Sequence, residues 1–562
     1  MKKAISIGIQ GFSALREQDC FFVDKTNFIK EWWENRDVVT LITRPRRFGK
    51  TLNMSMLECF FSNKYANRAD LFEGLSIWQE EAYRKLQGSY PVIFLSFAAV
   101  KAGNLEDAKT QIKQEIARLY RENRNLMKED IFGEDERELY YQTTVKMDDV
   151  TAQDSLRNLS EWMERYYGKK VIILLDEYDT PMQEAYVQGY WDEFTAFVRS
   201  LFNASFKTNP YLERAIMTGI TRVSKESIFS DLNNLQVITT TSDLYADCFG
   251  FTESEVFHVL DEFGMGDKKD EVKQWYDGFT FGEHKDIYNP WSITNYLDKR
   301  KTYPYWASTS SNGLVSRLIR TASADVKEKM EDLLNGREIV VSFDEQIVYN
   351  QLDHNENAIW SLLLASGYLK VKNVDYRGIT REPWYTLDIT NIETLSMFTT
   401  MFQDWFQNQD ANYGYFMKAL INGDLEAMNY YMNKVALATF SYFDVGSGNG
   451  SDPEPERFYH GFVLGLIAER TGIYEIRSNR ESGFGRYDIM MIPQECEKYP
   501  AIIIEFKVCS RMKKETLEEA VQSALDQIVD KNYDAELLSQ GIAADRIRHY
   551  GFAFEGKRVL IG

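Results

Sequence analysis

The chain has 562 residues, of which 44% are apolar and 27% are charged, with a net charge of −20. This length predicts three or four domains with cores of their own, and the acidic balance argues against a broad nonspecific grip on nucleic acid. No apolar run approaches the roughly 18 residues that a membrane span needs. Residues 1–10 lack the apolar segment of a signal peptide. We therefore expect a cytoplasmic protein with no membrane partner.

The acidic charge is unevenly distributed along the chain. From Glu454 onward there are 15 basic residues against 18 acidic ones, so this part is nearly neutral. A C-terminal region that handles nucleic acid is compatible with that balance. The five cysteines are scattered without C-x-x-C pairs, which fits reduced thiols better than disulfides or a zinc site.

The first functional motif is a candidate phosphate-binding loop. An apolar run at residues 38–42 predicts a strand and residues 52–61 predict a helix, and between them lies the sequence Arg44-Pro45-Arg46-Arg47-Phe48-Gly49-Lys50-Thr51. At such a junction the backbone N–H groups and the helix dipole converge on an anion. We expect this loop to bind ATP, with Lys50 reaching the β- and γ-phosphates and the Thr51 hydroxyl binding Mg²⁺.

One position of this loop departs from the pattern G-x-x-x-x-G-K-[ST]. Arg44 stands where the pattern has its first glycine. A surface turn after a short strand is the alternative interpretation. The context of strand, loop and helix favours the nucleotide site.

A second motif lies far downstream of the loop. Residues 171–175 form an apolar run that predicts a central parallel strand, and Asp176 and Glu177 follow at its carboxyl end. Open α/β sheets bind their ligands at that end. We assign Asp176 to Mg²⁺ and Glu177 to polarising the attacking water. The alternative is an acidic turn with no ligand.

The elements around these motifs follow a βαβ pattern. Strands are predicted at residues 91–97 and 213–220, and a helix at 105–123, whereas residues 126–149 are expected to be irregular. Thr218 and Arg222, at and beyond the tip of the later strand, are candidates for sensing the γ-phosphate. Either residue could instead be a cap or a surface ion-pair residue.

Residues 245–445 read as a helical lid and a helical or winged-helix-like middle domain. Thr252 and Glu255 have the spacing of a capping box at a helix start. Residues 446–453 (Gly-Ser-Gly-Asn-Gly-Ser-Asp-Pro) sustain neither a helix nor a strand, and they predict a linker. The expected domains are 1–244, 245–445 and 454–562, with the linker between the last two.

The C-terminal domain carries a candidate metal-dependent catalytic site. Strands are predicted at residues 473–477, 487–492 and 501–507. The strand period of two places Glu505 and Lys507 on one face. If Asp488 opens the neighbouring strand, the two carboxylates can hold Mg²⁺ or Mn²⁺, and Lys507 can orient a water against a scissile phosphate.

Further residues are candidates for this site. Glu456, on a leading helix predicted at 456–469, is a candidate metal ligand, although a helix-start glutamate favoured by the dipole is the alternative. Either Gln522 or Gln527, on a helix predicted at 515–530, reaches the site, and Gln527 is the better candidate. Arg486 is a candidate phosphate contact, with an ion pair to Glu481 as the alternative.

Several motifs together resemble the predicted AAA-ATPase-like family of bacteria, whose members often carry a C-terminal PD-(D/E)XK nuclease domain. The resemblance rests on residues 44–51, Leu175-Asp176-Glu177-Tyr178-Asp179, Phe229-Ser230-Asp231-Leu232-Asn233-Asn234-Leu235 and Trp275-Tyr276-Asp277-Gly278-Phe279. It implies an α/β protein with an N-terminal three-layer αβα P-loop NTPase domain. It further implies a C-terminal α/β restriction-endonuclease-like domain with Asp488, Glu505 and Lys507 as its D…E-x-K set. An arginine at the first glycine position is familiar in that family.

Two functions of different classes follow. The first is an ATP-hydrolysing protein coupled to a metal-dependent nuclease that acts on nucleic acid, with DNA the expected substrate. The second is an ATP-driven switch or scaffold that uses a degenerate nuclease fold only to bind nucleic acid or protein. Because a decayed site usually loses one of its residues, the presence of Asp488, Glu505 and Lys507 together favours the first. Either function is compatible with a homo-oligomer.

Overall fold

The computed structural model describes two compact units of the chain. The first unit comprises Met1–Leu318 and Glu338–Ser396, and the second comprises Ile319–Arg337 and Met397–Gly562. The described residues are 3–128, 131–222, 228–229, 232–307, 313–334, 336–345, 349, 352, 355–407, 412–439, 463, 473–482, 485–509, 515–555 and 558–562. The expected linker at 446–453 and most of the helix predicted at 456–469 lie outside them.

A five-stranded parallel sheet forms the centre of the N-terminal part. Its strand order is β2-β3-β4-β1-β5, so β4 separates the strands that carry the two phosphate-site motifs. The strands are β1 (Val39–Thr43), β2 (Val92–Ser96), β3 (Val171–Asp176), β4 (Leu212–Gly219) and β5 (Leu235–Ile238). Every residue of β1 and β3 is buried, as expected for inner strands covered on both faces.

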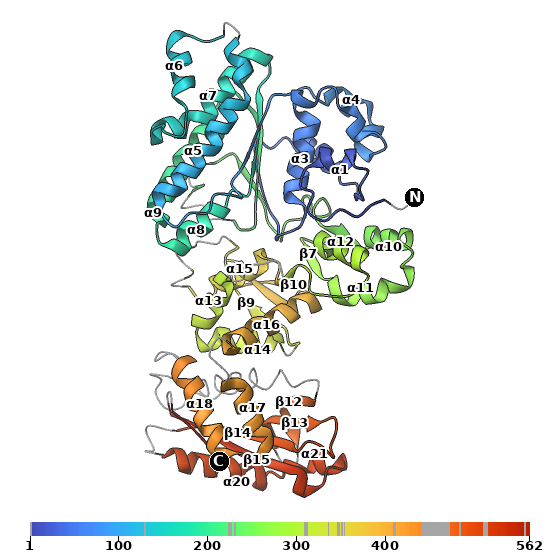
Figure 1. Cartoon of the computed structure of the whole chain (residues 1–562), viewed down its shortest axis with the longest axis vertical. Helices are drawn as coiled ribbons and strands as arrows, with labels where there is room; N and C mark the ends of the chain where they lie inside the picture. The colour runs from blue at the N-terminus through green and yellow to red at the C-terminus, as the bar shows by residue number, and fades with distance from the viewer. Residues whose placement is uncertain are drawn as a thin grey trace. The chain divides into compact units, whose positions relative to one another are not determined.

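Helices cover both faces of this sheet, which gives three layers (Figure 1). One face carries α1 (Phe12–Glu17), α3 (Lys50–Phe61) and α4 (Glu81–Leu86). The other carries α5 (Leu105–Glu122), α7 (Asp149–Tyr167), α8 (Thr180–Gln188) and α9 (Trp191–Phe202). The parallel sheet between two helical layers confirms the predicted P-loop type of α/β fold.

The stretch expected to be irregular contains a helix. Within residues 126–149 the chain forms α6 (Glu134–Gln142), whose first turn holds three acidic residues that suit the positive end of the helix dipole. Tyr140 of this helix is buried, with its ring centroid 4.9 Å from that of Tyr120 and 5.5 Å from that of Trp162. The expectation was wrong because this aromatic packing, rather than local periodicity, stabilises the helix.

The remainder of the first unit adds two small antiparallel sheets to the helices that the sequence predicts. Their strand orders are β6-β8-β7 and β10-β11-β9. The strands are β6 (Phe251–Thr252), β7 (Phe279–Phe281), β8 (His284–Tyr288), β9 (Ile339–Val341), β10 (Leu369–Arg377) and β11 (Glu382–Ile389). The helices are α10 (Glu253–Glu262), α11 (Lys269–Tyr276), α12 (Pro290–Lys299) and α15 (Ala358–Ala365).

The capping box at the start of α10 is present as predicted. The Glu255 N–H donates to the Thr252 hydroxyl at 3.4 Å, and the Thr252 N–H donates to the Glu255 carboxylate at 2.8 Å. These reciprocal bonds satisfy two N–H groups that a helix start otherwise leaves without partners. The position of α10 could therefore be read from the sequence.

The second unit is built on a mixed sheet of order β12-β13-β14-β15-β16, in which β14 and β15 are parallel and the other pairs are antiparallel. The strands are β12 (Tyr474–Ser482), β13 (Gly485–Pro493), β14 (Ala501–Val508), β15 (Ile547–Glu555) and β16 (Arg558–Ile561). Ile502, Ile504 and Phe506 pack in one core with α17 (Asn412–Asn422) and α18 (Leu425–Thr439). Ala501 and Ile503 pack with α20 (Leu517–Asp530) and α21 (Asp534–Ser539) in another core. The two helical layers therefore lie on opposite faces, as the strand period requires.

Two asparagines attach α18 to the edge strand β16. The Asn429 side chain accepts from the Ile561 N–H at 2.8 Å and donates to the Ile561 carbonyl at 2.7 Å. One helical turn later, Asn433 makes the same pair of bonds with Val559, at 3.0 and 2.7 Å. An edge strand leaves such groups without partners. The sheet formed by residues 474–561 thus packs against α17 and α18, which belong to the region 245–445 that we expected to form the middle domain.

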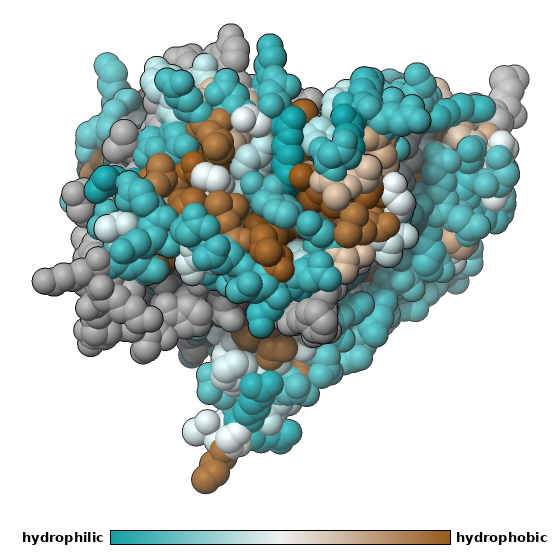
Figure 2. Space-filling view, turned by 90° about the horizontal axis from the view of Figure 1, so that it is seen from below, coloured by the Kyte–Doolittle hydropathy of each residue, from teal (hydrophilic) through white to brown (hydrophobic). Residues whose placement is uncertain are grey.

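The outer surface is mixed. The face in Figure 2 carries apolar patches between hydrophilic side chains, and isolated apolar residues are normal on a folded surface. In the described parts of the chain no helix has the length and apolar character needed to cross a membrane.

A buried carboxylate in the first unit makes a pH-dependent contribution to stability. Glu393, in the first turn of α16 (Ile392–Gln407), accepts from the Trp306 N–H at 2.6 Å and from the Ser292 hydroxyl at 2.8 Å. Burial raises the pKa of Glu393 to about 7, and the hydrogen bonds offset part of that rise. The folded state therefore holds a proton that the unfolded state releases above its ordinary pKa of 4.5.

The stabilisation of the folded state by protonated Glu393 is complete below pH 4.5 and is lost as the pH rises through about 7. Relative to Glu393→Gln, which cannot ionise, the wild type should lose roughly 2 to 3 kcal/mol of unfolding free energy between about pH 5 and about pH 8. Urea unfolding of both proteins at the two pH values measures this difference. Glu283→Gln, at an exposed position, should follow the wild type. Parallel pH profiles for wild type and Glu393→Gln would contradict the assignment.

Candidate functional site

The candidate phosphate loop, residues 44–51, joins β1 to α3. Gly49, at the N-cap of α3, has φ +82° and Arg47 has φ +66°, so the backbone turns through left-handed conformations before the helix starts. The Lys50 ammonium donates to the carbonyls of Arg44 at 2.9 Å and of Pro45 at 2.8 Å, and Lys50 is only 6% exposed. Burial lowers the pKa of Lys50, although three nearby carboxylates act in the opposite direction. The lysine is thus already held inside the loop.

Arg44, which replaces the first glycine of the motif, is an anchor of the loop. Its guanidinium is buried, donates to the carbonyls of Thr43 at 2.9 Å and Thr239 at 2.7 Å, and lies 4.5 Å from the ring centre of Phe281. Burial lowers its pKa to about 9. The Arg44 guanidinium is held by these carbonyls, and the part of Arg44 in binding ATP stays a prediction. A glycine here would leave that space unfilled.

The structure brings together three predicted site residues at the end of β3. The Thr51 hydroxyl donates to one oxygen of the Asp176 carboxylate at 2.7 Å, and the Thr218 hydroxyl donates to the other oxygen. Asp176 is 1% exposed; burial raises its pKa and the two hydroxyl donors lower it. A carboxylate beside a hydroxyl at the mouth of a phosphate loop is a donor set that suits Mg²⁺. These residues therefore fit a bound magnesium ion.

Glu177 occupies a strained position directly after the strand. Its φ of +52° is left-handed, which is uncommon for a residue with a side chain and clusters at functional sites. Its carboxylate accepts from the Thr180 hydroxyl at 3.1 Å, and the next residue, Tyr178, donates its N–H to the Thr218 carbonyl at 3.0 Å. The turn carries the Glu177 carboxylate past the sheet edge, where a water could approach a phosphate.

The structure adds one carboxylate that sequence reasoning missed. Asp179 is 4% exposed and accepts from the N–H groups of Ile220 at 2.9 Å and Thr221 at 2.7 Å, and from the Thr221 hydroxyl at 2.9 Å. It fixes the segment that leaves β4. Its signal was present in the motif, as a third acidic residue after Asp176 and Glu177.

Arg222 is half-buried, four residues beyond Thr218 and past the end of β4. Within the ranges that the structure describes, no hydrogen bond or ion pair joins it to Asp176 or Glu177. Its part in sensing a phosphate therefore stays a prediction.

The outer side of the loop packs against the region after residue 245. Phe48 lies 4.8 Å from Phe279 between ring centroids, and the exposed Arg47 lies 4.3 Å from the ring centre of Trp291. Gly367, with φ +81°, passes so close that an added Cβ would be 2.7 Å from Pro45. The loop is thus supported from two sides.

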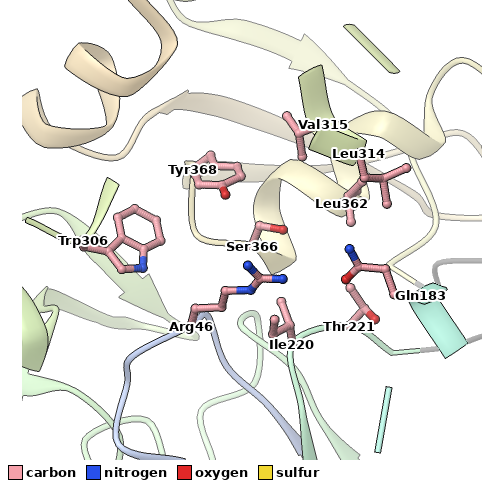
Figure 3. A pocket seen from close by; sticks show the side chains of 10 residues that line it. All are labelled: Arg46, Gln183, Ile220, Thr221, Trp306, Leu314, Val315, Leu362, Ser366 and Tyr368. Carbon is pink, nitrogen blue, oxygen red and sulfur yellow. The ribbon is translucent and has the colours of Figure 1, made fainter. Parts of the chain in front are cut away.

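Arg46 lines a cavity of about 40 Å³ next to the loop (Figure 3). The other lining residues are Gln183, Ile220, Thr221, Trp306, Leu314, Val315, Leu362, Ser366 and Tyr368. The cavity has room for about two or three waters or one small anionic group.

The second candidate site lies on the mixed sheet of the second unit. The register pairs Ile489 of β13 with Ile504 of β14, so Asp488 stands opposite Glu505. The Asp488 carboxylate accepts from the Phe506 N–H at 2.8 Å, and the Lys507 ammonium lies 3.7 Å from the Glu505 carboxylate. Burial raises the pKa of Asp488 to about 6, while the Phe506 N–H and the Lys507 charge lower it. Two adjacent, largely buried carboxylates are a set that a divalent cation would stabilise.

Gln527 of α20 completes this cluster. The Lys507 ammonium donates to the Gln527 carbonyl oxygen at 2.7 Å, and the Gln527 amide donates both to the Glu505 carboxylate and to the Tyr533 hydroxyl. Gln522 instead donates to Asp526 at 2.8 Å on the exposed side of the helix. Of the two glutamines considered from the sequence, Gln527 is therefore the one that reaches the site. Tyr533 had no sequence signal.

Two further candidates cannot be placed at this site. Glu456 and the side chain of Arg486 lie outside the described residues. The backbones of Glu481 and Arg486 are partners in the pairing of β12 with β13, which brings the two residues of the alternative ion pair opposite one another.

Comparison with known proteins finds family matches for two segments of the chain, one for each candidate site. Residues 6–229 match the family described as "Predicted AAA-ATPase", and residues 454–562 match the family described as "PD-(D/E)XK nuclease superfamily". The chain is also similar to a protein of Azotobacter chroococcum mcd 1 described as "Uncharacterized protein in vnfD 5'region". The two are 27% identical over 398 residues, which cover 70% of this chain and 68% of that protein. The first match contains the phosphate loop, and the second contains Asp488, Glu505 and Lys507.

Proposed function

We propose that the protein hydrolyses ATP and couples this reaction to metal-dependent cleavage of nucleic acid, with DNA the substrate. The proposal is supported by the match of residues 6–229 to the predicted AAA-ATPase family and of residues 454–562 to the PD-(D/E)XK nuclease superfamily. The observation that carries the proposal is the cluster of Asp488, Glu505, Lys507 and Gln527, which hydrogen bonds and an ion pair hold together. A fold kept only for binding has no need of such a cluster. The proposed activity belongs in the cytoplasm, where ATP and DNA are both at hand.

In the proposed ATPase reaction Thr51 and Asp176 would hold Mg²⁺, which would neutralise phosphate charge. Lys50 leaves the loop carbonyls to bind the β- and γ-phosphates. Glu177 orients the attacking water and accepts its proton as the bond from the water oxygen to the γ-phosphorus forms and the bond to the bridging oxygen breaks, whose electron pair leaves with ADP. Thr218, bonded to Asp176, links the β4 tip to the same centre.

In the proposed nuclease reaction Asp488 and Glu505 would hold the divalent cation, which would stabilise the negative charge that develops on the scissile phosphate. Lys507 orients the attacking water by donating to it. Gln527 fixes Lys507 and Glu505 relative to one another through its two ends. The Phe506 N–H keeps the Asp488 carboxylate facing Glu505.

Incubation of the whole chain with plasmid, linear and single-stranded DNA, and with RNA, tests the proposal. The reactions contain Mg²⁺ or Mn²⁺, with and without ATP, and a chelator serves as the control. We expect that DNA is cleaved only when the metal is present. The rate of cleavage should change when ATP is added. Metal-independent binding of DNA without any cleavage would favour the alternative of an ATP-driven binding protein. If only RNA were cleaved, the proposed substrate would be RNA instead of DNA.

A further inference from the structure

The side chain of Arg46 has a direction that the loop motif does not explain. It rises from the phosphate loop into the cavity and points between Ser366 and Gln183 (Figure 3). Arg46 is half-buried. In the described parts of the chain, no carboxylate forms an ion pair with it. A guanidinium held in a cavity beside the nucleotide site is thus available for an anion.

The position of Arg46 within the loop places it near the terminal phosphate. The Lys50 ammonium lies against the carbonyls of Arg44 and Pro45, the two residues that precede Arg46. In a loop of this type the lysine marks where the β- and γ-phosphates lie. The positive charge of Arg46 acts on the Lys50 ammonium, so an anion that contacts both side chains would be stabilised by both charges.

The other polar walls of the cavity come from the segments that follow the catalytic residues. Gln183 lies on α8, which begins just after Glu177. Thr221 follows Thr218 at the tip of β4 and is fixed by Asp179. The cavity therefore lies at the carboxyl ends of β3 and β4. The γ-phosphate of a bound ATP is expected at the same edge of the sheet.

The remaining walls are supplied by the region after residue 245. Trp306, Ser366 and Tyr368, with the aliphatic side chains of Leu314, Val315 and Leu362, close the cavity on this side. The Tyr349 hydroxyl bonds to the Thr221 hydroxyl at 3.1 Å, which ties this region to the same segment. A phosphate group in this cavity would be within reach of the polar side chains of Arg46, Gln183, Thr221 and Ser366.

From this arrangement we propose that Arg46 binds the γ-phosphate of ATP in the same chain and makes the site discriminate triphosphate from diphosphate. The inference rests on the ATPase proposed above. The forked N–H donors of a guanidinium match phosphate oxygens in pairs. When water attacks, the bond from the γ-phosphorus to the bridging oxygen breaks and its electron pair leaves with ADP. Arg46 stabilises the charge on the transferred group during that step.

The test compares the affinities of ADP and a non-hydrolysable ATP analogue, each with Mg²⁺, by calorimetry. Arg46→Ala should weaken binding of the analogue by about 10- to 100-fold, the effect of a lost hydrogen bond to a charged group. It should weaken ADP binding by less than about threefold, because ADP does not reach the cavity. ATP turnover at saturating ATP should fall by about 10²-fold or more. Arg46→Lys, which keeps the charge but loses the fork, should fall between wild type and Arg46→Ala.

The matched control is Arg118→Ala, which removes the same charge from α5, outside the loop. Arg118 is exposed and pairs with Glu115 at 2.8 Å, so this change should leave the ratio of the two affinities unaltered. Equal weakening of both nucleotides by Arg46→Ala, or no weakening of either, would overturn the inference while leaving the ATPase in place if Lys50→Ala still abolishes binding. Failure of the wild type to bind either nucleotide would overturn the ATPase and the inference together.

Discussion

Lys50→Ala should abolish ATP binding, whereas Glu177→Gln should bind ATP as the wild type does and hydrolyse it far more slowly. Lys50 sits inside the loop, where its ammonium now satisfies two backbone carbonyls and would exchange them for phosphate oxygens. Loss of these charge-assisted bonds should weaken ATP binding by at least about 100-fold. Glu177 lies directly after β3 and is proposed to act on the attacking water, so its loss should slow turnover by roughly 10²- to 10⁴-fold.

Calorimetry gives the affinities for this comparison, and phosphate release at saturating ATP gives the turnover. Lys30→Ala is a suitable control, because it removes an exposed lysine that pairs with Glu80 at 2.6 Å in the same unit. Circular dichroism verifies that each variant is folded. An unchanged ATP affinity in Lys50→Ala would show that the loop does not bind phosphates. If Glu177→Gln hydrolysed ATP as fast as the wild type, Glu177 would not be the catalytic carboxylate.

Asp488→Ala and Glu505→Ala should each abolish DNA cleavage, and Lys507→Ala should reduce it by roughly 10²- to 10⁴-fold. The two carboxylates are the proposed metal ligands, so their variants should also lose Mn²⁺ binding. The Lys507 ammonium donates to Gln527 at 2.7 Å and is proposed to orient the water, so Lys507→Ala should keep metal binding largely intact. The effect of each variant on Mn²⁺ binding thus distinguishes a metal ligand from a residue that orients the water.

The two glutamines of α20 provide a matched pair for this experiment. Gln527→Ala removes the group that joins Lys507 to Glu505, and cleavage should fall. Gln522→Ala removes an exposed side chain bonded only to Asp526 among the contacts described, so the rate should stay near that of the wild type. Plasmid nicking and linear-DNA digestion measure these rates, and ATP hydrolysis should persist in every variant. Cleavage that survives Glu505→Ala would place the activity at another site.

The sequence by itself determined the local parts of both sites. Five apolar residues followed by Asp176 and Glu177 predict a buried strand with carboxylates at its tip, because a strand covered on both faces must be apolar throughout. The spacing of Glu505 and Lys507 places both on one face, because side chains alternate along a strand. Lys50 and Thr51 follow from the strand, loop and helix that surround them. These features depend only on neighbours in the chain.

Only the tertiary structure decided which distant residues meet. That β4 runs between β1 and β3 brings Thr218 to Asp176, and that Arg44 is buried follows from the arrival of Thr239 and its neighbours beside the loop. The attachment of α18 through Asn429 and Asn433 likewise depends on an edge strand more than 120 residues away in sequence. Gln527 and Gln522 are chemically identical, and the direction each faces from α20 distinguishes them. Local periodicity carries no information about such contacts, because they arise when separate elements pack and satisfy one another's buried polar groups.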